Sequence, residues 1–504
     1  MNQMLLVVAL TLVLGDASIA VPGHAGGSHS DSVERITPAT GPLRVSKTNP
    51  RYFSAEGGPP IYLTGSHAWA ELQDGAWEEL PGEVFDYKAY LKLFTNYNLN
   101  LMRMWAVETT RLHSRDLSLT TPMPYKRSGS GSALDGELKF DLRRFNQAYF
   151  DRLRSRVMAA RDLGIYVMVM LFQGFSIESK GSSKRDPWSG HPFHSANNTN
   201  GIDGDANRNG EGEEVHTLKI PAITRLQEGY IRKVIDTLND LDNVVYEISN
   251  ESHNQSISWQ YHMIRYIHEY EKRKPKQHPV VMTVAYPNGD NSALFKSPAE
   301  AISPNPGGGY NDNPPAADGN KIIIADTDHL LGDDVDHKWV WKSFLRGLNP
   351  IFMDFGANPG KPDAPKWQLI RRNLGYTRKY AQRINLETMI PHNDLASSGY
   401  CLAQPGVAYL AYLPYGRSMS VDLRAAKGSM KVEWFSPSTG ETVDGGTIEG
   451  GARKELTSPF MRRFTVHWMR RNFDGVLRTL GVDKPAQTGD SVLFLTASEA
   501  TSQP

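Results

Sequence analysis

Two stretches of the sequence carry the residue types that acid–base and nucleophilic chemistry need. Residues 243–252 read NVVYEISNES, an apolar run that contains Glu247 and ends in Asn250 and Glu251. Residues 321–329 read KIIIADTDH, a second apolar run, followed by Asp326, Asp328 and His329. Two carboxyl groups held near each other, one protonated and one ionised, can act as a general acid and a nucleophile. The question is which fold brings these stretches together.

Apolar runs of strand length alternate with segments of helical periodicity. The runs are 60–64, 100–104, 165–172, 243–248, 279–285, 321–325 and 350–354, and 301–303 is a short eighth candidate. This alternation predicts an α/β fold with a parallel sheet, and continuous apolar strands indicate burial on both faces. Eight such units in about 250 residues or more favour a (β/α)8 TIM barrel. A doubly wound sheet is the alternative, but no G-x-G-x-x-G motif opens a helix.

In a barrel of this kind the carboxyl ends of the strands line the active site. There the strands would present polar and aromatic residues, namely His67 and Trp69, Arg103 and Trp105, Gln173, Asn250 and Glu251, and Asp326, Asp328 and His329. Carboxylates, Arg, His, Asn and Trp together are typical of a sugar-binding catalytic site. Glu247 shares the strand parity of Glu251 and lies one layer lower, so we expect it to be a buried ion-pair partner. Asp354 follows the last strand and could be structural or functional.

The YEISNE stretch resembles the fourth-strand motif of clan A glycoside hydrolases, which are retaining (β/α)8 enzymes. The resemblance, of an apiosidase-like or cellulase-like kind, covers roughly residues 45–395. It implies that Glu251 is the general acid/base, that Asn250 binds the sugar 2-hydroxyl and that Arg103 holds the nucleophile. In that clan the nucleophile is a Glu at the end of the seventh strand. Here Asp326 has the matching place and Asp328 lies two residues further on, so both are candidates.

The pattern changes after residue 395 to polar–apolar alternation with turn signals, which predicts a small β-sandwich over 396–497. The stretches PYGRSMSVDL and EWFSPSTGE resemble the β-domain called a "putative collagen-binding domain", which often follows apiosidase-like barrels. A basic, partly helical insertion at 462–488 departs from that pattern.

The N-terminus predicts export. Residues 5–14 are apolar and Ser18-Ile19-Ala20 resembles a cleavage site, so we expect a signal peptide at 1–20 and a flexible leader at 21–44. The apolar run is shorter than the roughly 20 residues that span a bilayer. We therefore expect a secreted or periplasmic protein that is not stably inserted in a membrane once the signal peptide is removed. Balanced charge, 55 basic and 55 acidic residues, gives no reason to expect a nucleic-acid partner.

The sequence gives little sign of a required cofactor. Cys401 is the only cysteine, which excludes Cys-based metal sites and a Cys-pair redox centre. Asp326, Asp328 and His329 could bind a metal, but the ligand set needs more histidines. Asp205, Asn207 and Asn209 match the start of a calcium loop whose closing Glu is replaced by His216. A structural calcium ion and a solvated acidic loop are the two interpretations.

Together these features predict an exported retaining O-glycoside hydrolase that cleaves plant or microbial oligo- or polysaccharides with two carboxylates. A non-catalytic carbohydrate- or matrix-binding protein with a degenerate barrel is the alternative from another class. A metal-dependent hydrolase is a third.

Overall fold

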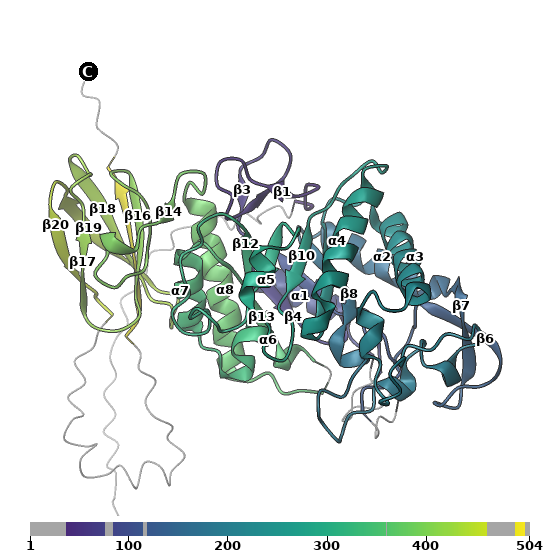
Figure 1. Ribbon diagram of the computed structural model, residues 1–504. Helices are drawn as coiled ribbons and strands as arrows, with labels where there is room; N and C mark the ends of the chain where they lie inside the picture. The colour runs from purple at the N-terminus through teal and green to yellow at the C-terminus, as the bar shows by residue number, and fades with distance from the viewer. Residues whose placement is uncertain (1–36, 76–83, 114–117, 359, 461–488, 499–504) are drawn as a thin grey trace, which may run out of the picture. The chain divides into compact units, whose positions relative to one another are not determined.

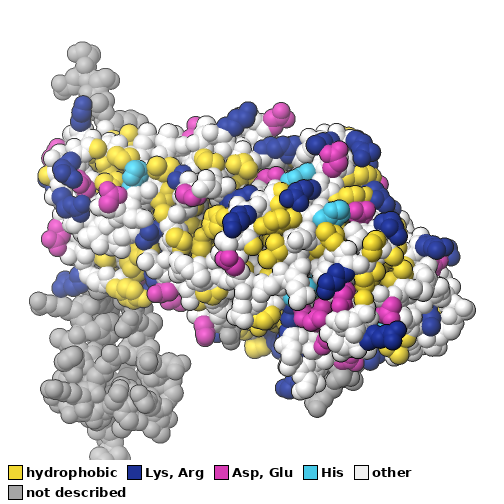
Figure 2. Space-filling view, viewed as in Figure 1, with side chains coloured by type: hydrophobic (Ala, Val, Ile, Leu, Met, Phe, Trp, Pro, Cys, Tyr) yellow, Lys and Arg dark blue, Asp and Glu magenta, His cyan; other side chains and the backbone are white. Residues whose placement is uncertain are grey.

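The computed structural model describes residues 37–75, 84–113, 118–358, 360–460 and 489–498 (Figure 1). The predicted signal peptide, residues 21–36 of the predicted leader and the predicted insertion at 462–488 lie outside these ranges. Across the described part of the chain, no helix combines the length and apolar character needed to cross a membrane. Basic and acidic side chains are intermixed on the face shown in Figure 2.

Eight parallel strands close into a barrel, which confirms the predicted (β/α)8 fold. In order around the barrel they are β4 (Gly65–His67), β5 (Leu101–Met104), β8 (Tyr166–Gln173), β9 (Val244–Asn250), β10 (Val280–Thr283), β11 (Ala301–Ser303), β12 (Ile322–Asp326) and β13 (Asn349–Met353), which pairs with β4. The short run at 301–303 is therefore a true barrel strand.

Helices flank the barrel (Figure 1). They are α1 (Tyr87–Asn96), α2 (Gln147–Arg161), α3 (Pro221–Leu238), α4 (Ile257–Glu271), α5 (Asn291–Phe295), the short α6 (Thr327–Leu330), α7 (His337–Leu345) and α8 (Pro365–Arg383). Alternate strand residues such as Met102, Tyr246 and Ile323 belong to the large buried cluster that contains residues of these helices. The apolar runs are continuous because the strands are covered on both faces.

The first barrel strand differs from the predicted one. Pro60–Ile61 forms β3 of a small antiparallel sheet with β1 (Arg44–Val45) and β2 (Phe53–Ser54), and the barrel strand begins at Gly65. A Cβ at Gly65 would lie 1.8 Å from the carbonyl oxygen of Leu101, so glycine permits the close approach of β4 to β5. The folded chain begins before residue 45, since Leu43 is fully buried.

The barrel interior is built in layers. Leu101, Val245 and Ile324 belong to one buried apolar cluster at the lower level. Because side chains alternate along a strand, the residues two positions further on, Arg103, Glu247 and Asp326, face the same interior one layer higher. The apolar layer thus supports a charged one.

Two long loops at the carboxyl ends of the strands fold against each other. One contains the hairpin of β6 (Tyr125–Ser132) and β7 (Leu138–Phe145), and the other is the segment 174–216. They share a buried cluster that includes Tyr125, Phe140 and Trp188. The length of 174–216 is accommodated by this packing rather than by strands or long helices of its own.

The C-terminal region is a β-sandwich, as predicted. One sheet has the order β14 (Ile390–Pro391), β15 (Cys401–Gln404), β16 (Ala408–Leu413), β21 (Ser491–Ala497), β18 (Ser429–Phe435) and β19 (Thr442–Glu449). The other pairs β17 (Ser418–Asp422) with β20 (Arg453–Thr457). Trp341 of α7 packs against Phe435 of β18, with ring centroids 5.9 Å apart.

Candidate active site

The buried guanidinium of Arg103 is the centre of the site. Its Nε and Nη2 donate to the two oxygens of Glu247 at 2.8 and 2.6 Å. Nη2 also donates to Asn250 Oδ1 at 2.7 Å, and Nη1 donates to Asp326 and Asp328, at 3.1 Å each. All five donors of the guanidinium are thereby used. Three carboxylates face one cation, so the group carries an excess of negative charge.

The side chains of Glu247 and Arg103 are fully buried and form an ion pair, which confirms the predicted structural role of Glu247. The pair is bidentate, the geometry in which a guanidinium and a carboxylate hold each other most firmly. Glu247 therefore fixes the orientation of Arg103, and Arg103 in turn orients the residues above it.

His67 and Trp105 hold Asp326 from the other side. Trp105 Nε1 donates to His67 Nδ1 at 2.8 Å, and His67 Nε2 lies 3.0 Å from Asp326 Oδ1. Because the indole N–H can only donate, His67 Nδ1 accepts and Nε2 carries the proton that faces Asp326. Burial alone would raise the pKa of Asp326, but His67 and Arg103 outweigh it and hold this pKa well below the usual range. Asp326 is therefore ionised.

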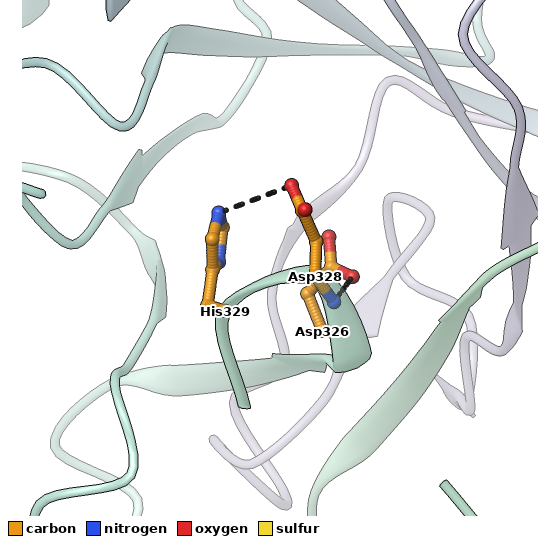
Figure 3. Close-up of side chains that lie close together, drawn as sticks. All are labelled: Asp326, Asp328 and His329. Carbon is orange, nitrogen blue, oxygen red and sulfur yellow. Dashed lines mark hydrogen bonds and ion pairs between the residues drawn. The ribbon is translucent and has the colours of Figure 1, made fainter. Parts of the chain in front are cut away.

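Asp328 lies on α6, one short step beyond Asp326 (Figure 3). Its side chain is 12% exposed, whereas that of Asp326 is 1% exposed. Arg103 binds its Oδ2, and no residue in the described ranges donates a hydrogen bond to its Oδ1. Asp328 thus combines a fixed charge partner with one carboxylate oxygen left for another molecule.

His329 completes the set by orienting Asn250. The Asn250 atom that faces Arg103 must be the oxygen, because a guanidinium can only donate. His329 Nε2 lies 3.0 Å from the same oxygen and must therefore donate to it, while Nδ1 accepts from Ser303 Oγ at 2.9 Å. Burial lowers the pKa of His329, in keeping with a neutral ring. Asn250 Nδ2 is buried and has no hydrogen-bond partner among the described residues, so it is a donor for a ligand oxygen.

Glu251 lies at the end of β9 in an unusual backbone conformation. Its φ is 47°, in the left-handed region that costs a non-glycine residue about 1–2 kcal/mol. A Cβ at Gly174 would lie 2.2 Å from the Glu251 carbonyl oxygen, so the end of β8 passes close by. Strain of this kind at a strand end is common at functional sites.

The Glu251 carboxyl group is set up to keep its proton. The residue is 8% exposed, and none of the described side chains or amides hydrogen-bonds to its carboxyl group. Burial, and then the negative charge of Asp328, raise the pKa of Glu251 well above its usual value, against the opposing charges of Arg103 and Lys180. One site therefore holds a Glu251 whose pKa is raised and an Asp328 carboxylate that is paired with Arg103.

A second layer supports the Glu251 strand. Glu108 Oε2 accepts a hydrogen bond from the main-chain N–H of Gln173 at 2.7 Å and lies 3.0 Å from His216 Nε2. His216 Nδ1 contacts Ser252 Oγ at 2.8 Å, directly after Glu251. Although burial opposes it, contact with His216 and His191 lowers the pKa of Glu108 to about 2. No periodic pattern links His216 to this site, because His216 ends a long irregular loop.

The remaining predicted residues lie at different distances from the Arg103 group. The Trp105 ring stacks on His67 at 5.7 Å, and the partly exposed Trp69 meets Trp105 edge-on at 6.5 Å. Gln173 belongs to the Glu108 layer, where its Oε1 accepts from Ser176 Oγ at 2.6 Å. Outside the site, Asp354 forms a buried ion pair with Arg371, which supports its structural reading.

The predicted calcium loop, which begins at Asp205, lies in the second half of the segment 174–216 and is mostly exposed. Asp205, Asn207 and Asn209 turn their side-chain oxygens toward main-chain N–H groups of the same loop. His216, at the closing position, is committed to Glu108 instead. A calcium ion there stays a prediction.

A metal ion does not fit the strand-seven residues. Asp326, Asp328 and His329 have ligand atoms within 4.8 Å of one another, the one such group found in the described part of the chain. Arg103 Nη1 already bridges the two aspartates, and His329 Nε2 faces Asn250. A cation would have to displace the guanidinium, so this donor set suits arginine rather than a metal.

Comparisons with known proteins agree with this architecture. A family model described as a domain of unknown function (DUF6298) matches residues 91–298, which include Arg103 and Glu251. A second, described as "Putative collagen-binding domain of a collagenase", matches residues 387–469. No curated protein matches the chain.

Three solved structures are similar over nearly the whole chain. One, described as a glycoside hydrolase, is 12% identical and covers 92% of this chain and 99% of its own, with a TM-score of 0.58. A glycoside hydrolase family 5 from Bacteroides vulgatus ATCC 8482 is 12% identical and covers 91% and 94%, with a TM-score of 0.58. A "putative glycoside hydrolase" from the same strain is 14% identical and covers 91% and 83%, with a TM-score of 0.59. At these identities the likeness is one of fold.

The raised pKa of Glu251 predicts a pH-dependent effect of Glu251→Gln on stability. The folded protein binds this proton more tightly than the unfolded chain, so the wild type loses stability as pH rises from the usual Glu range through the folded pKa. The amide has no such loss. We expect the free energy of unfolding of the variant, relative to wild type, to be larger at about pH 8 than at about pH 5.

Urea unfolding of both proteins at the two pH values measures this difference. Glu137→Gln makes the same chemical change at an exposed position of the β6–β7 hairpin and is the matched control. An equal difference for Glu251→Gln at both pH values would show that Glu251 titrates normally.

Proposed function

We propose that this protein is an exported retaining O-glycoside hydrolase in which Glu251 is the acid/base and Asp328 is the nucleophile. The observation that carries the proposal is the juxtaposition of a buried Glu251, whose carboxyl group has no hydrogen-bond partner among the described residues, with an Asp328 that is paired with Arg103. Retaining hydrolysis needs such a pair, with carboxyl groups about 5–5.5 Å apart. The fold shared with glycoside hydrolases supports the same reading.

Asp328 is a better nucleophile candidate than Asp326 for two reasons. Asp326 Oδ1 receives both His67 and the Asp328 amide, and Oδ2 receives Arg103, while the side chain is almost fully buried. Asp328 has a more exposed side chain, and one of its oxygens receives no hydrogen bond from the part of the chain that the structure describes. Its position two residues beyond the strand end supplies the reach that a Glu at position 326 would gain from its longer side chain.

The two steps follow from these assignments. Asp328 attacks the anomeric carbon as the bond to the leaving oxygen breaks, and Glu251 gives its proton to that oxygen. Water then attacks the same carbon and gives a proton to Glu251, and the ester bond to Asp328 breaks. The excess negative charge around Arg103 stabilises the oxocarbenium-like transition state, and Asn250 Nδ2 donates to a sugar hydroxyl.

The wider proposal concerns where the enzyme acts. We infer that residues 1–20 direct export and that the secreted or periplasmic enzyme cleaves plant or microbial polysaccharide. The C-terminal β-sandwich would bind polymeric substrate or matrix and keep the barrel near it. No cofactor takes part in the proposed steps.

Glu251→Gln should lower kcat by about 10²–10⁴ on a natural glycoside, because proton donation to the leaving oxygen is lost. A panel of aryl furanosides and pyranosides identifies the sugar, and steady-state kinetics on its natural linkage measure the effect. Glu137→Gln is the control and should act like wild type. Near-normal turnover by Glu251→Gln would contradict the assignment, and binding without hydrolysis by wild type would favour a non-catalytic carbohydrate-binding protein.

Trapping distinguishes the two aspartates. A 2-deoxy-2-fluoro glycoside with a good leaving group should form a stable ester on Asp328. The fluorine slows both the formation and the hydrolysis of this ester, and the good leaving group restores the rate of its formation only. Peptide mapping by mass spectrometry locates the label. A label on Asp326 would overturn the choice of nucleophile, and turnover of the natural substrate without any labelling would argue against a covalent intermediate.

A further inference from the structure

Beside Glu251 lies a group of aromatic and cationic side chains, here called the Phe175 cluster: Phe175, Lys180, Arg185 and Tyr286. Phe175 follows β8 and Tyr286 follows β10, the two strands that flank β9 in the barrel. Their ring centroids are 5.8 Å apart at 31°. The Tyr286 amide donates to the Ser252 carbonyl at 3.0 Å, so the pair spans the strand end that carries Glu251.

Arg185 is the member of the cluster with donors to spare. Its guanidinium carbon lies 4.4 Å from the centre of the Phe175 ring, and the residue is partly buried. Its side chain forms no hydrogen bond or ion pair with any residue that the structure describes. Arg103 and Arg371, the two buried arginines among the described residues, differ in this respect, because each is paired with carboxylates. All five N–H groups of Arg185 are therefore open to a ligand.

Lys180 is already committed. Its Nζ pairs with Glu178 and donates to the Tyr286 carbonyl at 3.1 Å, so it ties the two sides of the cluster together. The Tyr286 ring, 42% exposed, offers an apolar face of the kind that sugars stack on, and the Phe175 ring packs between this ring and Arg185. The cluster thus combines a stacking surface with one unpaired guanidinium.

The charges differ on the two sides of Glu251. Toward β12 lie Asp326 and Asp328, which with Glu247 outnumber Arg103. Toward β8 and β10 lie Arg185 and Lys180, both near enough to interact electrostatically with the Glu251 carboxyl group when it is ionised. Because Lys180 is paired with Glu178, Arg185 supplies the net positive charge of the Phe175 cluster. An anionic sugar would be repelled from the side of the nucleophile and attracted to the other.

We propose that Phe175, Tyr286 and Arg185 bind the leaving-group sugar and select one that carries a carboxylate. The inference rests on the proposed function, since the acid Glu251 marks the boundary between the sugar that is attacked and the sugar that leaves. A guanidinium binds a carboxylate through two parallel hydrogen bonds, a geometry that a neutral hydroxyl cannot reproduce. The preferred linkage would join a neutral sugar to a uronic acid, with the neutral sugar at Asp328.

A matched pair of substrates tests this selection in the full-length enzyme. Both carry the neutral sugar found by the panel, one with 4-hydroxybenzoate and the other with 4-hydroxybenzamide as the leaving group. Wild type should prefer the benzoate by about tenfold in kcat/KM, in line with a charge-assisted hydrogen bond. Arg185→Gln should abolish the preference, Arg185→Lys should restore part of it, and added salt should weaken it in wild type.

Arg265→Gln is the matched control, because Arg265 on α4 stacks on Tyr261 in the same way, with its guanidinium carbon 5.8 Å from the ring centre, but lies on a flanking helix. It should keep the wild-type preference. Equal rates on both substrates in wild type, or an unchanged preference in Arg185→Gln, would overturn the inference while leaving the proposed hydrolysis intact.

A binding measurement separates this inference from the proposed function. Titration of Glu251→Gln with D-glucuronic acid and with D-glucose, followed by NMR, should show tighter binding of the acid, and the difference should disappear in the Glu251→Gln/Arg185→Gln double variant. Failure of wild type to cleave either aryl substrate would count against the glycosidase. Equal binding of the two sugars by Glu251→Gln would count against the anionic subsite.

Discussion

The buried guanidinium of Arg103 is the interaction on which the rest of the site depends. It joins β5 to β9 through Glu247 and Asn250, and to β12 and α6 through Asp326 and Asp328. Charges this deep are tolerated only when they are paired and hydrogen-bonded, and removal of one partner typically costs 3–5 kcal/mol. The hydrogen bonds that pair Arg103 also place the carboxylates of Asp326 and Asp328 and the amide of Asn250 at fixed positions. The contacts that stabilise the charged layer therefore also set the geometry of the site.

Glu251 takes no part in the hydrogen bonds of Arg103. Its buried carboxyl group has no hydrogen-bond partner among the described residues and its backbone is left-handed, two features that oppose folding. Both make sense if a proton must be kept near a negatively charged neighbour. Gly174 packs against the Glu251 carbonyl, and the Glu108–His216 pair contacts Ser252. These contacts hold the end of β9 in place and support the strained backbone of Glu251.

Much of this arrangement could be predicted from the sequence, because two-residue alternation along a strand determines which side chains share the barrel interior. Glu247 as a buried ion-pair partner follows from that rule, whereas the contact of Arg103 with Asp326 and Asp328 is implied by the resemblance to clan A glycoside hydrolases. The start of the first strand could not be read in this way, since it depends on the close approach of Gly65 to β5. His216 and Arg185 lie in a long irregular loop, where no periodicity relates a residue to its tertiary contacts. Asp328 was placed beside Asp326 by proximity in the sequence, but its greater exposure is evident only in the folded chain.

Burial and the neighbouring negative charge of Asp328 together raise the pKa of Glu251, and titration of Glu251 itself tests this most directly. Carboxyl-¹³C glutamate labelling, with the Glu251 signal assigned by its absence in Glu251→Gln, follows this group by NMR in wild type and in Asp328→Asn. We expect the pKa of Glu251 to lie above the usual Glu range in wild type and to fall when the charge at position 328 is removed. An ordinary pKa in wild type, or one that does not move in Asp328→Asn, would contradict this expectation.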